Sequence, residues 1–77
     1  MPLKRALQPM PDFVASALDT AGLRDAYDAR PDYQRNDYLG WINQAKREAT
    51  KKKRLAQMLE ELRSGDTYMD MPWGARS

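Results

Sequence analysis

The chain of 77 residues contains no cysteine and no histidine. These absences exclude disulfides, thiol nucleophiles, imidazole acid–base chemistry and zinc sites with cysteine or histidine ligands. The sequence also has no glycine-rich phosphate loop, and Ser16 and Ser64 have no histidine to activate them. We therefore expect a protein that is not an enzyme and that has no catalytic residues, no metal site and no cofactor.

Long apolar segments are also missing. No segment approaches the roughly 20 apolar residues that a transmembrane helix requires. The N-terminal sequence, with Pro2 and Pro9, lacks the apolar run of a signal peptide. We expect a cytoplasmic protein with one small domain, since a chain of this length buries only about 60% of its unfolded surface.

The sequence does contain apolar residues spaced i, i+3, i+4 and i+7, which is the pattern of one helical face. The predicted helices are residues 11–21, 23–29, 31–46 and 48–64. The first begins with Pro11 beside an acidic residue and ends at Gly22, a typical left-handed terminator. No segment alternates long enough to predict a strand.

These patterns predict an all-α fold, a compact bundle of about four short helices. We expect a flexible N-terminal arm (residues 1–10), a helical domain (11–65) and a C-terminal tail (66–77). The predicted core is Val14, Leu18, Tyr27, Tyr38, Trp41, Ile42, Leu55, Leu59 and Leu62. Gly40, inside the third helix, either allows another helix to approach closely or is a tolerated flaw that costs about 1 kcal/mol relative to alanine.

One group of residues resembles a known family. It comprises Pro11, Asp12, Ala17 and Leu18, then Tyr38, Trp41, Ile42, Ala45, Lys46, Arg47 and Thr50, then Arg54, Leu55, Met58, Leu59, Ser64 and Gly65. Over residues 11–65 the sequence is similar to the YdeI/OmpD-associated (bacteriocin-protection) family. The resemblance implies a compact helical domain, and the family label implies a role in porin association or in protection against membrane-active peptides.

The positive charge is concentrated in one segment. Residues 1–45 carry five basic and six acidic groups, and residues 55–77 carry two basic and four acidic groups. Residues 46–54 carry six basic groups and one acidic group, a net charge of +5. We call residues 46–54 the basic segment.

The basic segment predicts an anion-binding site made of Arg47, Thr50, Lys53 and Arg54. On a helical wheel these three cations point away from the apolar face. Cations at the start of a helix oppose its macrodipole, and free amides there bind anions. The predicted partner is a phosphate-bearing polyanion: nucleic acid, nucleotide or anionic lipid. The other interpretation, a solvated face that keeps the domain soluble, stays open.

A protein partner is the alternative prediction. The tail contains Tyr68, Met69 and Trp73, residue types that are common at interface hot spots. The tail is either a flexible end or a strap that docks these side chains on the bundle, and a homodimer is also possible.

Other candidate side chains are assigned structural roles. Tyr38 and Trp41 share a stripe with Ile42 and are expected in the core rather than as base-stacking platforms, whereas Tyr33 is expected to be exposed. Two carboxylate pairs are expected at the surface: Asp25 with Asp28, and Glu60 with Glu61.

Overall fold

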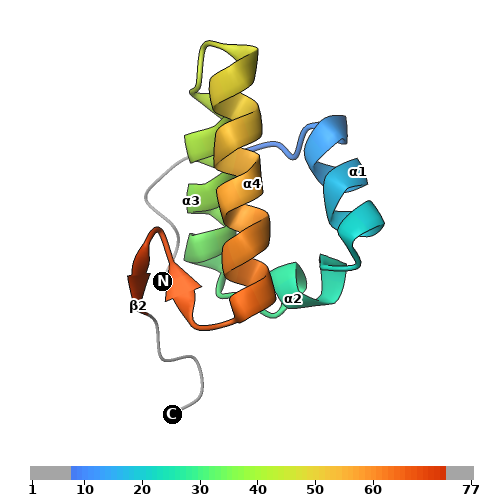
Figure 1. Ribbon diagram of the computed structural model, residues 1–77, viewed down its shortest axis with the longest axis vertical. Helices are drawn as coiled ribbons and strands as arrows, with labels where there is room; N and C mark the ends of the chain where they lie inside the picture. The colour runs from blue at the N-terminus through green and yellow to red at the C-terminus, as the bar shows by residue number, and fades with distance from the viewer. Residues whose placement is uncertain (1–7, 73–77) are drawn as a thin grey trace.

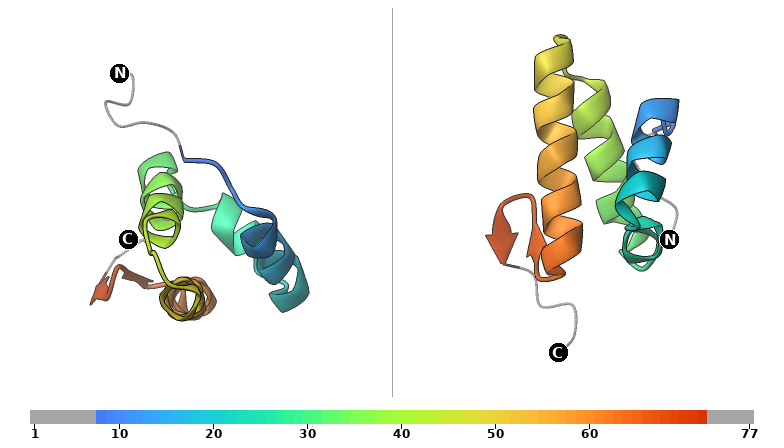
Figure 2. Two further views of the ribbon diagram at one scale, coloured as in Figure 1. Left: turned by 90° about the horizontal axis from the view of Figure 1, so that it is seen from above. Right: turned by 45° about the vertical axis from the view of Figure 1, so that its right-hand side comes forward.

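The computed structural model describes residues 8–72 of the chain. Its elements are α1 (Asp12–Ala21), α2 (Arg24–Asp28), α3 (Asp32–Asn43), α4 (Glu48–Ser64), β1 (Thr67–Tyr68) and β2 (Met71–Pro72). α3 and α4 lie side by side and run in opposite directions, α1 and α2 pack on one side of this pair, and the two strands lie beside the C-terminal end of α4 (Figures 1 and 2). The prediction of an all-α bundle with four helices is confirmed.

The first helix begins and ends as its sequence predicts. Pro11 has extended backbone angles, and its carbonyl oxygen accepts hydrogen bonds from the N–H groups of Val14 and Ala15. Gly22 ends the helix in the left-handed region, with φ of 70°, and its N–H donates to the Asp19 carbonyl. A residue with a side chain is disfavoured at such a φ, which is why glycine is the usual terminator.

The bounds of α4 agree with the prediction, but α3 ends three residues before the predicted Lys46. The chain must reverse between α3 and α4, and it does so over residues 44–47. Ala45 is still buried. Its N–H donates a hydrogen bond to the Ile42 carbonyl, and the resulting turn keeps its side chain in the core. The apolar spacing therefore continues past the end of the helix.

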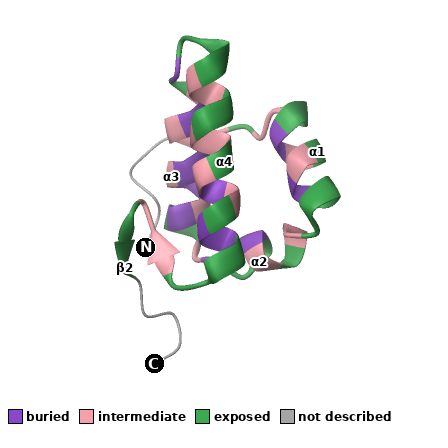
Figure 3. Ribbon diagram, in the orientation of Figure 1, coloured by how far each residue is buried: buried purple, intermediate pink, exposed green. Residues whose placement is uncertain are grey.

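The core lies between α1, α2, α3 and α4, where the buried residues line the facing sides of the helices (Figure 3). Six predicted core residues are buried: Val14, Leu18, Tyr27, Tyr38, Ile42 and Leu62. The other three, Trp41, Leu55 and Leu59, are only partly buried and pack at its edge. The most deeply buried residue on the α4 face is instead Met58.

The segment after α4 forms a small hairpin that was not predicted. Thr67 pairs with Pro72 and Tyr68 with Met71, in antiparallel register. The turn residues Met69 and Asp70 both have positive φ, 51° and 66°, as the two central residues of a type I′ turn do. Strands of two residues are too short to alternate, and Met-Asp lacks the glycine that usually marks this turn.

The hairpin distinguishes between the two predictions made for the tail, a flexible end and a strap docked on the bundle. Tyr68 and Met69 pack against the core, so the described part of the tail is a strap docked on the bundle. Trp73 and residues 1–7 of the predicted arm lie outside the described residues. Within residues 8–72, no helix is both long and apolar enough to span a membrane.

Candidate functional site

The basic segment occupies the turn before α4 and the first two turns of that helix. Arg47 is the residue before the helix, with extended backbone angles, and it makes no side-chain capping hydrogen bond in the described part of the chain. Its carbonyl accepts the N–H of Lys51 at 3.0 Å. The N–H groups of the first helical turn therefore lack a capping acceptor from Arg47 and carry the positive end of the helix dipole.

Three of the four predicted anion-binding residues are accessible to solvent. Arg47 and Lys53 are exposed, and Thr50 is half-buried. Three salt bridges occur between residues 8 and 72: Arg24–Asp19, Arg35–Asp32 and Arg63–Glu60. None of them uses a cation of the basic segment, so this charge is not neutralised at short range by the described residues.

Arg54 does not point away from the protein as expected. Its Nη1 donates to the carbonyl oxygen of Trp41 at 2.7 Å, and its guanidinium carbon lies 5.3 Å from the centroid of the Trp41 ring. Trp41 is in the last turn of α3, where the negative end of the helix dipole favours a cation. Arg54 thus joins α4 to the end of α3, and only its charge contributes to the basic surface.

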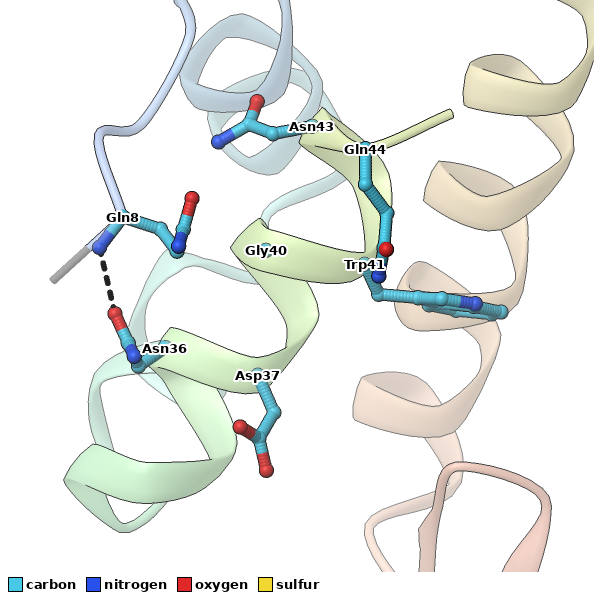
Figure 4. Close-up of a pocket in the computed structure, with 7 residues that line it drawn as sticks. All are labelled: Gln8, Asn36, Asp37, Gly40, Trp41, Asn43 and Gln44. Carbon is cyan, nitrogen blue, oxygen red and sulfur yellow. Dashed lines mark hydrogen bonds between the residues drawn. The ribbon is translucent and has the colours of Figure 1, made fainter. Parts of the chain in front are cut away.

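A polar groove of about 400 Å³ crosses the outer face of α3 next to this contact (Figure 4). It is lined by Gln8, Asn36, Asp37, Gly40, Trp41, Asn43 and Gln44. We call it the α3 groove. A Cβ atom on Gly40 would lie 3.2 Å from Cγ of Gln8, so the close approach at Gly40 is made by the segment before α1 and not by a helix.

Two amides hold the segment before α1 against α3. The backbone N–H of Gln8 donates to Oδ1 of Asn36 at 2.7 Å, and Nδ2 of Asn43 donates to the Pro9 carbonyl at 3.0 Å. The side-chain amides of Gln8 and Gln44 make no hydrogen bond with any described residue. These two amides are therefore available to a ligand. The groove could not be predicted from the sequence, because single amide residues without periodicity carry no signal.

The comparisons with known proteins identify the family. The family described as bacteriocin-protection, YdeI or OmpD-associated matches residues 9–65. The chain belongs to the YdeI/OmpD-associated family. The match confirms the resemblance, and no curated protein and no solved structure matches the chain.

The match to the YdeI/OmpD-associated family covers all four helices, including the whole basic segment and the α3 side of the groove. The hairpin of residues 67–72 lies beyond it. The features of the matched region and of the hairpin can therefore be considered separately.

The hairpin is held by a carboxylate that we predicted to lie at the surface. Glu61 is buried, and the prediction of a surface pair is wrong for this residue. Its carboxylate accepts the N–H of Met69 at 2.8 Å, the N–H of Asp70 at 2.7 Å and the hydroxyl of Tyr38. The N–H groups of Met69 and Asp70, the two central residues of the turn, thus both point at this carboxylate.

The environment of Glu61 determines its ionisation. Burial alone would raise the pKa of this carboxyl group, but the hydrogen bonds from Tyr38, Asp70, Met69 and Gln57 outweigh burial and leave the pKa below its usual value. Burial, together with the same contact, raises the pKa of Tyr38. The spacing of Met58, Glu61 and Leu62, on one helical face, was the signal that Glu61 faces inward.

The aromatic residues of the tail are used within the protein. The Tyr68 hydroxyl donates to Oδ2 of Asp37 at 2.5 Å, and its ring makes edge contacts with Tyr33 and Tyr38 at centroid distances of 5.9 and 5.4 Å. Met69 packs on the core, and Trp73 lies outside the described residues. Tyr33 is 42% exposed, as expected. The described tail thus offers little free aromatic surface to a protein partner.

Proposed function

We propose that this member of the YdeI/OmpD-associated family is a non-enzymatic accessory module that binds a phosphate-bearing partner through the basic segment. One observation carries this proposal: five cations of the segment form no ion pair within residues 8–72, at a helix start where Arg47 makes no side-chain cap. These cations are Lys46, Arg47, Lys51, Lys52 and Lys53.

The arrangement is unfavourable in the free protein, and this supports a ligand. Cations near the start of a helix oppose the macrodipole, at about 0.3–1 kcal/mol for an exposed residue in the first turn, and the one carboxylate of that turn, Glu48, offsets part of this cost. Local rules that are broken without full compensation are candidates for function. A bound phosphate reverses the penalty, because it accepts hydrogen bonds from free helix N–H groups and pairs with nearby lysines.

The distribution of cations favours an extended partner over a single small anion. Arg47 and Lys53 lie more than one helical turn apart on α4, so one phosphate cannot contact both closely. Several phosphates on one chain can contact several lysines together. Binding of this kind depends strongly on salt, because each neutralised phosphate releases counterions.

The proposal is tested by an NMR titration with inorganic polyphosphate at low ionic strength. The amides of residues 47–53 should shift, and the shifts should fade as salt is added. Lys53→Gln should weaken binding about two- to fivefold, since one cation contact is lost. Arg63→Gln is the matched control, because it removes one exposed positive charge near the far end of the same helix.

Two results would contradict the proposal. One is the absence of any shift in residues 47–53 at low salt. The other is an equal loss of affinity in Lys53→Gln and Arg63→Gln, which would mean that only net charge matters and that the start of α4 is not a site.

A further inference from the structure

We infer that the α3 groove binds a base of a single-stranded nucleic acid whose phosphates lie on the basic segment. This inference rests on the proposed function and names the class of its partner. It starts from one contact: Trp41 lines the groove, and Arg54 of the basic segment lies against its ring. The groove and the basic segment are therefore neighbouring parts of one surface.

The groove has the chemistry of a site for an uncharged, hydrogen-bonding group. Amide side chains both donate and accept hydrogen bonds, and asparagine and glutamine match the edges of bases. Gln8 and Gln44 have side-chain amides without a partner among the described residues, and they approach the groove from opposite sides of α3 (Figure 4). The partly buried indole of Trp41 adds an aromatic surface of the kind on which bases stack.

The charges divide the surface into two parts. Asp37 contributes a carboxylate to the groove, which makes the groove less favourable for a phosphate than the basic segment. Asp37 already accepts the Tyr68 hydroxyl, so it is held in place by the hairpin. Phosphates are favoured instead at the basic segment, which begins two residues after Gln44. A strand of nucleic acid carries both kinds of group in alternation.

The size of the groove is compatible with this ligand. Its volume of about 400 Å³ lies within the roughly 300–1,000 Å³ typical of small-molecule sites. At Gly40 the side chain of Gln8 lies over the backbone of α3, since a Cβ atom there would lie 3.2 Å from Cγ of Gln8. Gln8 therefore covers α3 at this point and forms part of the groove wall.

The test compares three probes: a short thymidine oligonucleotide, an abasic strand of the same length, and inorganic polyphosphate. The thymidine strand should bind at least about threefold more tightly than the abasic strand, since base stacking contributes to affinity. Gln44→Ala should weaken binding of the thymidine strand by about two- to tenfold, as expected for one lost hydrogen bond. The same variant should leave binding of the abasic strand and polyphosphate unchanged.

Control variants separate this inference from the proposed function. Lys53→Gln should weaken the binding of all three probes, and Thr20→Ala, an exposed change on α1, should affect none. Equal affinity for thymidine and abasic strands, or no effect of Gln44→Ala, would overturn the groove as a base site while the anion site stands. No binding of polyphosphate would overturn both. Tighter binding to vesicles of anionic lipid than to the oligonucleotide would overturn the assignment to nucleic acid.

Discussion

The two ends of α4 differ in how the protein satisfies the unpaired backbone groups of the helix. Every helix leaves unpaired N–H groups at its start and unpaired carbonyl groups at its end. At the C-terminal end one of these carbonyls is well satisfied: that of Glu61 accepts hydrogen bonds from Gly65 N–H, from the Ser64 hydroxyl and from the buried guanidinium of Arg30 at 2.9 Å. Arg30 also places a positive charge where the dipole favours it.

The N-terminal end is less well provided. Glu48 gives the first turn one charge of the favourable sign, but Arg47 occupies the position where serine, threonine or aspartate would cap the helix, and the cations from Lys51 onwards carry the unfavourable sign. The C-terminal end of α4 thus has more stabilising contacts within the described residues than the N-terminal end.

The largest effect is expected at the C-terminal end. Glu61→Ala removes the acceptor for the Met69 and Asp70 N–H groups and for the Tyr38 hydroxyl. We expect the free energy of unfolding to fall by about 3 kcal/mol, because the buried Tyr38 hydroxyl and two part-buried N–H groups lose their acceptor. Urea denaturation measures this. The neighbouring Glu60→Ala, which breaks only an exposed pair with Arg63, should change stability by less than about 1 kcal/mol.

If both variants lost similar stability, the Glu61 carboxylate would have no special role in holding the hairpin. A loss confined to Glu61→Ala should also change the environment of Tyr38, and near-ultraviolet circular dichroism would report that change.

A pH dependence follows from the same carboxylate. The pKa of Glu61 is lowered in the folded state, so near that pKa the unfolded chain binds more protons than the folded one. The stabilisation from Glu61 is therefore complete above the unfolded value of about 4.3 and is lost as the pH falls through the lower folded value. Urea midpoints measured from about pH 7 to about pH 3, on both sides of the reference pKa of glutamate, report this loss of stability. Glu61→Gln should flatten the acid limb, and an unchanged slope would contradict the assignment.

At the N-terminal end a substitution should raise stability. Arg47→Asp places a capping carboxylate on a residue that already has the extended angles of a cap. We expect a gain of about 1 kcal/mol in the free energy of unfolding, together with weaker polyphosphate binding. Lys46→Asp makes the same charge change one residue earlier and should stabilise less. A loss of stability in Arg47→Asp would show that the start of α4 is already satisfied.

The helices could be predicted because their signals are local. Pro11 and Gly22 bracket α1, and the apolar spacing of α4 fixes its face. The hairpin could not be predicted, because it exists only where the Glu61 carboxylate meets two N–H groups from residues eight and nine positions later. Contacts of this kind depend on tertiary structure, and a short strand carries no pattern of its own.

The candidate site likewise has features that could be predicted from the local sequence and features that could not. Arg47 and Lys53 were identified from a local run of charge, and their exposure followed from the helical wheel. The contact of Arg54 with Trp41 and the groove beside it depend on how α3 packs against α4. Sequence reasoning placed Trp41 in the core because its stripe is apolar, but a side chain at the end of a stripe lies at the edge of the interface.

The smallest effect concerns Gly40, which lines the α3 groove. Gly40→Ala should gain up to about 1 kcal/mol of helix propensity, less the energy needed to displace the Gln8 side chain, whose Cγ lies 3.2 Å from the new methyl group. Because Gln8 is a flexible side chain, we expect a net gain of about 0.5 kcal/mol in urea denaturation. The methyl group also narrows the groove, so affinity for the thymidine strand should fall while affinity for polyphosphate stays constant. The double variant with Gln8→Ala should recover the full helix gain, and a stability loss in that double variant would show that Gly40 is needed for a reason other than the approach of Gln8.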